Sequence, residues 1–203
     1  TEMWYVVDAD AGAGIYLGFN RPVSKEEVYE MAENGTVVSA LNFIPVKKGD
    51  FFFVRAGVVH AIGAGVTVAE IQQSSDLTYR VFDYNRLGAD GKPRQLHLEE
   101  ALKVMDFSAY SPGVQKMTVG SLKCDGTKSA PVKIAECKYF SVYKCRGGGN
   151  FVSPDSFVAV ICTSGSGDIS GRTMKKGDVF FVPAGKNFIT DGDAEYLIAG
   201  VEI

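Results

Sequence analysis

The residue types best suited to chemistry gather in one stretch of the chain, Lys47–Arg80. It offers an imidazole at His60, a carboxylate at Glu70 and a guanidinium at Arg80. Residues 51–54 are a short apolar run bounded by Gly-Asp and Ala-Gly, the pattern of a buried strand. His60 follows the turn and Glu70 ends a second strand-like run. The stretch therefore predicts a polar site built on two neighbouring strands and the loop that ends in Arg80.

The amino-acid composition limits the classes of protein to which the chain could belong. The 203 residues carry a net charge of −3 and are 46% hydrophobic, which is ordinary for a soluble globular protein. Such a charge gives no basic field for nucleic acid or anionic lipid. No apolar run approaches the ~20 residues that cross a membrane. The four cysteines show no CxxC spacing, so they predict reduced thiols in a cytoplasmic protein rather than a zinc knuckle.

Most of the predicted elements are strands. Residues 2–8 and 14–19 are expected to pair as a hairpin across Asp10-Ala11-Gly12. A Ser cap with Glu three residues later predicts a helix beginning after Ser24. Apolar residues at helical spacing predict a second helix over 98–105. Further strands are expected in residues 37–46, 79–84, 132–137, 139–145, 156–163, 179–182 and 195–201. Because the first strand begins at residue 2, we expect further chain upstream of Thr1.

An internal repeat organises these elements. Lys47–Gly57 reappears as Lys175–Gly185, at a constant offset of 128 residues. Two copies of one β unit predict two similar β domains, which we place at 1–107 and 108–203. Three residues past the shared Ala-Gly, the first copy has His60 and the second has Phe188. The chemistry is therefore expected in the first domain, with an apolar plug in the second.

The repeated motif resembles the second half-motif of the cupin family. Gly49, Arg55-Ala56-Gly57 and His60 follow its spacing, with Arg where the family has Pro. The second copy keeps Pro183-Ala184-Gly185 and lacks the histidine. The resemblance implies a mainly β protein made of two jelly-roll barrels, the first incomplete at its N-terminus, with a few short helices. Cupins hold a metal ion inside the barrel with His and Glu side chains.

Further motifs are similar to the short bacterial type I mannose-6-phosphate isomerases, and together they span almost the whole chain. They are Thr1–Tyr5, Val59–Ile62, Gln72–Asp76, Tyr79–Arg86 and Leu96–Leu98. The resemblance implies one zinc ion per chain, with Glu2 and His60 among its ligands. The family's remaining ligands lie in an upstream Gln-x-His motif. That motif has no counterpart in the 203 residues, which therefore hold half of a metal site.

The same resemblance assigns the polar roles. Arg80, four residues after Asp76, matches the family's active-site arginine; Asp76 would orient it, and Glu70 would line the pocket and move a proton. The implied reaction is the interconversion of mannose 6-phosphate and fructose 6-phosphate through a metal-stabilised cis-enediol, by a monomer acting on a hexose 6-phosphate.

Other interpretations stay open from the residues alone. Glu2 could be a solvated carboxylate, His60 a core histidine and Arg80 a surface loop residue. His97, before the second helix, is interpreted as structural. The rival functions are a non-catalytic cupin that binds sugar or has a structural role, and an iron-dependent cupin dioxygenase. The polar stretch that ends in Arg80 favours the isomerase.

Overall fold

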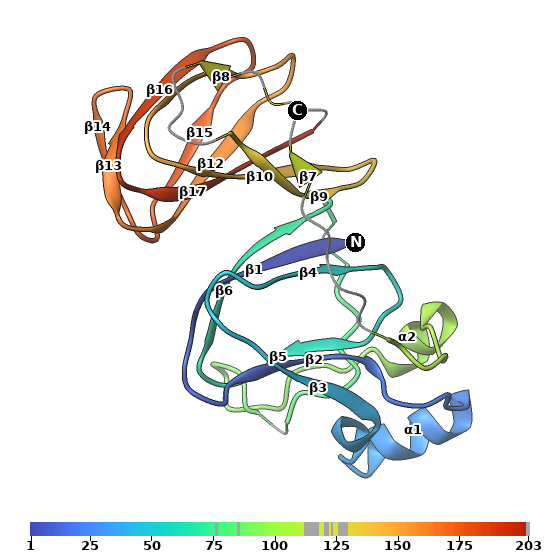
Figure 1. Ribbon diagram of the computed structural model, residues 1–203. Helices are drawn as coiled ribbons and strands as arrows, with labels where there is room; N and C mark the ends of the chain where they lie inside the picture. The colour runs from blue at the N-terminus through green and yellow to red at the C-terminus, as the bar shows by residue number, and fades with distance from the viewer. Residues whose placement is uncertain are drawn as a thin grey trace.

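The regular secondary structure is mostly antiparallel strands, which are arranged in two units (Figure 1). The computed structural model describes residues 1–75, 77–84, 86–111, 118–119, 122, 124–125 and 130–201. Two short helices and a single 3-10 turn complete the described secondary structure. The predicted mainly β fold with a few short helices is confirmed.

The first unit consists of two three-stranded sheets. One has the order β4–β1–β6 and the other the order β3–β2–β5. Their bounds are β1 Glu2–Ala9, β2 Gly14–Phe19, β3 Leu41–Pro45, β4 Phe51–Val54, β5 His60–Ile62 and β6 Val66–Gln72. The inner faces of both sheets share a core cluster of Trp4, Ile15, Leu17, Val54 and Val58.

The second unit is larger and is also made of two sheets. The six-stranded sheet has the order β15–β12–β17–β10–β9–β7, and the five-stranded sheet has the order β14–β13–β16–β11–β8. The bounds are β7 Thr118–Val119, β8 Cys124–Asp125, β9 Val132–Glu136, β10 Ser141–Arg146, β11 Gly149–Val152, β12 Val158–Ser164, β13 Ser166–Ile169, β14 Arg172–Lys175, β15 Val179–Val182, β16 Asn187–Gly192 and β17 Glu195–Gly200.

The two helices lie beside the first unit. Helix α1 (Lys25–Glu33) begins after Ser24, whose hydroxyl accepts a hydrogen bond from the Glu27 backbone N–H, as the cap predicted. Gly35, at φ +70°, follows the end of this helix. Helix α2 (Leu98–Val104) buries Leu98 and Leu102 in the cluster that also holds Val28 of α1. Its predicted apolar face is confirmed.

The predicted hairpin of residues 2–8 and 14–19 is wrong, although both strands exist. β1 pairs with β4 and β6, whereas β2 pairs with β3 and β5 in the other sheet. Both edges of β1 are therefore already occupied by neighbours. The turn at residues 10–13 carries the chain from one sheet to the other instead of closing a hairpin.

Two further strand predictions fail in part. Residues 37–40 form the 3-10 turn Val37–Ala40, and only 41–45 are extended as β3. Residues 79–84 form no strand. Tyr84 has φ +53°, which a strand excludes, and the backbone of Arg80 bonds to His97 rather than to a neighbouring strand.

The repeat is visible in the hydrogen bonds of the two units. The Lys47 N–H donates to the Asp50 carboxylate at 2.9 Å, and the Lys175 N–H donates to that of Asp178 at the same distance. The glycine between them has φ +92° in the first copy and +95° in the second, values that disfavour any residue with a Cβ. Two segments 128 residues apart thus fold into the same turn and feed equivalent strands, β4 and β15.

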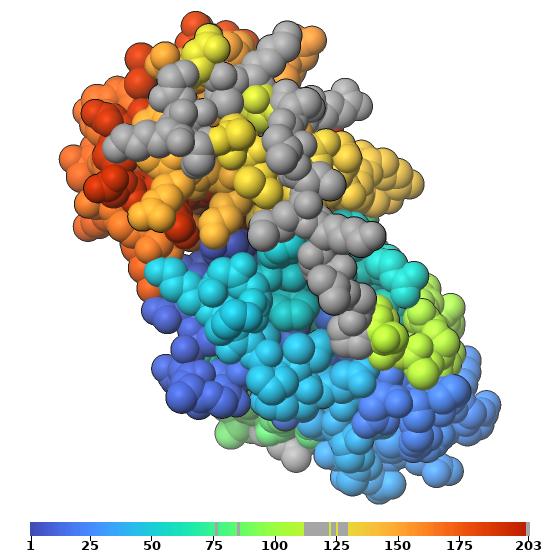
Figure 2. Space-filling view, in the orientation of Figure 1, coloured from blue at the N-terminus to red at the C-terminus, as the bar shows by residue number. Residues whose placement is uncertain are grey.

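The outer face of the β4–β1–β6 sheet packs against the six-stranded sheet of the second unit. Met3 and Tyr5 of the first unit share a buried cluster with Val142, Leu197 and Ala199 of the second. The two units therefore adjoin as lobes, the first blue to green and the second yellow to red in the space-filling view (Figure 2). Because β1 alternates sides, Met3 and Tyr5 face the second unit while Glu2 and Trp4 face into the first.

Candidate functional site

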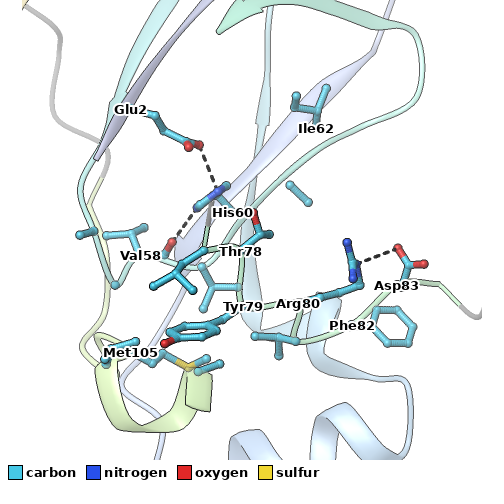
Figure 3. Close-up of a pocket in the computed structure, with 18 of the residues that line it drawn as sticks. Glu2, Val58, His60, Ile62, Thr78, Tyr79, Arg80, Phe82, Asp83 and Met105 are labelled. Carbon is cyan, nitrogen blue, oxygen red and sulfur yellow. Dashed lines mark hydrogen bonds and ion pairs between the residues drawn. The ribbon is translucent and has the colours of Figure 1, made fainter. Parts of the chain in front are cut away.

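Glu2 and His60 meet inside the first unit. The Glu2 Oε1 atom lies 3.1 Å from Nε2 of His60 (Figure 3). The register of β1 places Glu2 opposite Val54 of β4 and Gln72 of β6. His60 comes from the other sheet, where β5 places it opposite Leu17. The two predicted metal ligands are therefore brought together from different sheets.

The His60 ring is held in one orientation. Its Nδ1 atom lies 2.7 Å from the Val58 carbonyl oxygen, which accepts the ring N–H. Trp4 packs edge-on against the ring, with centroids 5.2 Å apart and the planes at 76°. Nε2 is thereby left to face Glu2 with its lone pair when the imidazole is neutral. This is the arrangement that metal-binding histidines use, in which the second nitrogen donates to a carbonyl.

The contact with Glu2 also changes the pKa of His60. Burial lowers the pKa of His60, but the hydrogen bond to Glu2 and the charge of that carboxylate outweigh it, so the pKa is raised overall. The Glu2 side chain is 15% exposed. A proton or a metal cation at Nε2 would satisfy both groups.

The donor set fits a zinc ion in type and spacing. Zinc binds imidazole nitrogen and carboxylate oxygen at about 2.0–2.2 Å in a tetrahedron, which puts two donors roughly 3.3 Å apart. The observed 3.1 Å between Oε1 and Nε2 agrees with that value. Within the described part of the chain, no group of three or more His, Cys, Asp or Glu side chains could enclose an ion. Glu2 and His60 are therefore two candidate donors in the described part of the chain.

A cleft of about 770 Å³ opens beside this pair, within the size range of small-molecule sites. Glu2 and His60 line it together with residues 77–84 and the two arginines Arg86 and Arg94. Figure 3 shows the Glu2–His60 pair on one side of the view and Arg80 with Asp83 on the other. A ligand in the cleft would therefore meet the histidine–carboxylate pair and a guanidinium.

Arg80 is fixed by its neighbours. Its backbone N–H donates to Nδ1 of His97 at 3.2 Å, and the His97 N–H donates to the Arg80 carbonyl at 2.8 Å. Its Nη1 group donates to the Gln95 carbonyl at 3.0 Å, and the side chain is 26% exposed. His97, interpreted from sequence as structural, thus positions Arg80. The cleft contains Arg80, as the sequence predicted.

The other two predicted catalytic residues have different outcomes. Glu70 lies directly opposite Trp4 on β6, so it shares the inner face of the sheet with Glu2. Burial and the charge of Glu2 raise its pKa. It is not among the described residues that line the cleft. Asp76 lies outside the described residues.

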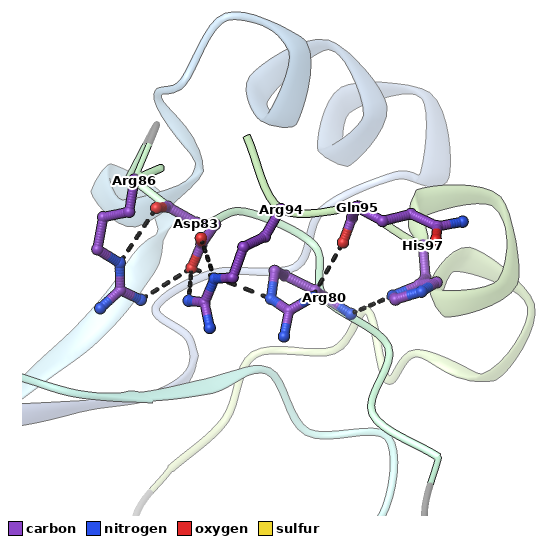
Figure 4. A network of polar contacts seen from close by, with 6 residues as sticks. All are labelled: Arg80, Asp83, Arg86, Arg94, Gln95 and His97. Atoms are coloured by element: carbon purple, nitrogen blue, oxygen red, sulfur yellow. Dashed lines mark hydrogen bonds and ion pairs between the residues drawn. The ribbon is translucent and has the colours of Figure 1, made fainter. Parts of the chain in front are cut away.

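Sequence reasoning missed a cluster of charges around Asp83. This buried carboxylate bonds to Arg86 and Arg94, and Nε of Arg80 lies 4.0 Å from it (Figure 4). Those bonds lower the pKa of Asp83 to about 2, with Arg94 contributing most. A signal was present in the sequence, since an acidic residue stands between two arginines within Tyr79–Arg86. Arg94 arrives from a loop that carries no periodic pattern.

Comparisons with known proteins agree over nearly the whole chain. No protein-family model matches it. It is 36% identical over 206 residues to mannose-6-phosphate isomerase ManA of Bacillus subtilis, covering 98% of this chain and 64% of that protein. It is 35% identical over 204 residues to mannose-6-phosphate isomerase of Streptococcus mutans, covering 97% and 62%.

Solved structures give the same result for the fold. The crystal structure of the Bacillus subtilis mannose 6-phosphate isomerase superimposes with a TM-score of 0.81 at 33% identity, covering 99% of this chain and 64% of that one. A putative mannosephosphate isomerase from Archaeoglobus fulgidus shares the fold at a TM-score of 0.72 and 19% identity, covering 100% and 61%. The chain thus spans less than two thirds of the length of these relatives. No described helix is long and apolar enough to cross a membrane.

Proposed function

We propose that this chain, a homologue of the mannose-6-phosphate isomerases along nearly its whole length, carries part of the active site of such an enzyme. The reaction would interconvert mannose 6-phosphate and fructose 6-phosphate. The observation that carries the proposal is the Glu2–His60 pair at 3.1 Å, lining one cleft with Arg80. Glu2 and the oriented His60 could hold a metal ion, and the fixed guanidinium of Arg80 could stabilise the negative charge that develops during an aldose–ketose isomerisation.

Glu2 and His60 would hold a zinc ion. The His60 Nδ1–H bond to Val58 and the packing of Trp4 orient the donating nitrogen before any ion arrives. When bound, zinc polarises a carbonyl oxygen and stabilises negative charge on it. The other ligands that a zinc ion requires would be residues other than Glu2 and His60.

Arg80 would bind the oxygen on which negative charge develops as a proton moves between C1 and C2. A guanidinium remains protonated at any working pH and offers two parallel N–H donors to a sugar oxygen or oxyanion. Two hydrogen bonds with His97 hold the Arg80 backbone, and a third, from Nη1 to the Gln95 carbonyl, holds the guanidinium. Preorganisation of this kind avoids reorganisation of the charge during the reaction.

Glu70 lies on the inner face of the sheet, opposite Trp4, and is not among the described residues that line the cleft. It would therefore assist proton movement indirectly, because its negative charge helps to raise the pKa of His60. Removal of the C2 proton with protonation of O1 would give the cis-enediol, and protonation of C1 with loss of the O2 proton would then give the ketose. The direction of the reaction follows the concentrations of the two hexose phosphates.

The test is metal analysis combined with a coupled assay for fructose 6-phosphate, applied to the full protein. We expect about one zinc ion per chain and turnover of mannose 6-phosphate that a chelator abolishes. Sugar binding without bound metal and without turnover would refute the isomerase and support a non-catalytic cupin module. Bound iron with oxygen consumption would support the dioxygenase.

A further inference from the structure

Three arginine side chains surround one carboxylate at the edge of the cleft. Arg80, Arg86 and Arg94 all line the cleft, and Asp83 lies among them with its side chain 6% exposed. In Figure 4 the three guanidinium groups stand side by side in a row, on the same side of Asp83. This cluster includes neither Glu2 nor His60, and Arg80 is the one arginine in it that the proposed reaction uses.

Each guanidinium is held by contacts that fix its direction. Arg86 donates from Nη2 to Asp83 Oδ1 at 2.8 Å, and its Cζ lies 5.6 Å from the centre of the Tyr84 ring. Arg94 donates from Nε to Asp83 Oδ2 at 2.6 Å and bonds to Oδ1 through Nη2. Asp83 therefore acts as a shared anchor for arginines from two segments of the loop.

The cluster carries more positive charge than its anchor neutralises. Three guanidinium groups and one carboxylate leave a net charge of +2. Within the described part of the chain, no acceptor bonds to Nη1 of Arg86, Nη1 of Arg94 or Nη2 of Arg80. Like charges held this close repel one another. One arginine would be enough to neutralise Asp83 in a structural ion pair. The presence of three arginines therefore favours the binding of an anionic ligand in the cleft.

We propose that Arg86 and Arg94, beside Arg80, form a subsite that binds the phosphate dianion of the sugar. The inference rests on the proposed function, because it supplies the binding site for the phosphate end of a hexose 6-phosphate. Guanidinium forks match phosphate oxygens in geometry as well as charge. With the phosphate at the arginines, the sugar extends into the cleft toward Glu2 and His60.

The two arginines have different tests because their structural roles differ. The Arg86 side chain is 62% exposed and makes one bond to the Asp83 carboxylate and one to the Asp83 carbonyl, so Arg86→Gln leaves both Arg94 bonds to the carboxylate in place and is expected to fold. Arg94 makes two bonds to Asp83, and Arg94→Gln loosens the anchor as well. Arg86→Lys keeps the charge and loses the fork. Arg172→Gln changes an exposed arginine on β14 that does not line the cleft, and it serves as the matched control.

The measurement is calorimetric binding of fructose 6-phosphate, inorganic phosphate and fructose to the full protein, with thermal unfolding of each variant alongside. We expect Arg86→Gln to weaken fructose 6-phosphate and inorganic phosphate by tenfold or more and to leave fructose unchanged. Arg86→Lys should fall between, and Arg172→Gln should match the parent. A folded Arg86→Gln protein that binds fructose 6-phosphate within twofold of the parent would overturn the subsite, whatever its melting temperature.

Binding and turnover separate this inference from the proposed function. A parent protein that binds fructose 6-phosphate through Arg86 but does not interconvert it with mannose 6-phosphate would support the subsite and refute the isomerase. A parent protein that isomerises the sugars while Arg86→Gln retains its KM would support the isomerase and refute the subsite.

Discussion

His60 and Phe188 occupy the same position in the two β units. Each follows the Ala-Gly of the shared turn by three residues. His60, the first residue of β5, pairs opposite Leu17, and Phe188, the second residue of β16, pairs opposite Phe151. Phe188 is buried and stacks on Phe151 with ring centroids 5.1 Å apart. One position thus holds a candidate metal ligand in the first unit and a core ring in the second.

Replacing His60 by the residue of the second copy should remove metal binding and keep the fold. His60→Phe takes away the nitrogen that faces Glu2 and fills the same space with an apolar ring. We expect zinc content to fall to background and turnover to drop by orders of magnitude, with an unchanged far-ultraviolet circular dichroism spectrum. A His60→Phe protein that retains stoichiometric zinc would exclude His60 as a ligand.

The reverse change, Phe188→His, should destabilise the second unit without creating a metal site. Phe188 is 4% exposed and lies among apolar residues. Losing its stacked ring and burying an imidazole there costs about 2–4 kcal/mol of the free energy of unfolding. Urea unfolding measures this cost. Unchanged stability, or a second bound zinc ion, would contradict the assignment of Phe188 as an apolar plug.

Arg80 should affect turnover more than stability. Arg80→Lys keeps a positive charge but loses the planar fork that Gln95 and the neighbouring carboxylate hold. We expect kcat to fall about a hundredfold or more, in the range of a lost oxyanion donor, with a melting temperature near that of the parent. Arg172→Lys is the matched control. A near-normal kcat for Arg80→Lys would remove the guanidinium from the mechanism.

The Asp83 carboxylate should make the free energy of unfolding depend on pH in the acidic range. Its pKa falls from 3.8 to about 2 in the folded protein because Arg94 and Arg86 bond to the ionised carboxylate. The lowered folded pKa means that this contribution is complete above pH 4 and is lost as pH falls toward 2. Asp83→Asn should remove it at all pH values. The gap in unfolding free energy between parent and Asp83→Asn should therefore shrink between pH 4 and pH 2. A constant gap would refute the charge anchor.

The sequence predicted what is local and repeated. The Ser24 cap and the apolar face of α2 were both predicted correctly, because each depends on residues close together in the chain. The Glu2–His60 contact came from a family resemblance, since the two residues lie on different sheets. No spacing rule joins them.

What could not be predicted depends on tertiary pairing. The hairpin failed because both edges of β1 are filled by distant strands, a fact that the apolar run of β1 does not encode. Residues 79–84 have strand-like composition, yet Asp83 is drawn to arginines and Tyr84 takes a positive φ. The arginine cluster needed Arg94, which a loop brings back to Asp83 from eleven positions away.

The interface between the two units should contribute most of its stability through apolar packing. Leu197 is fully buried between the sheets, whereas Lys176 reaches Asp8 across the exposed rim at 2.7 Å. Leu197→Ala should therefore cost about 2–5 kcal/mol of unfolding free energy. Lys176→Ala should leave the free energy of unfolding nearly unchanged, because exposed ion pairs contribute little. Chemical unfolding of both variants makes the comparison. A larger loss for Lys176→Ala than for Leu197→Ala would mean that charge, rather than buried apolar surface, joins the two units.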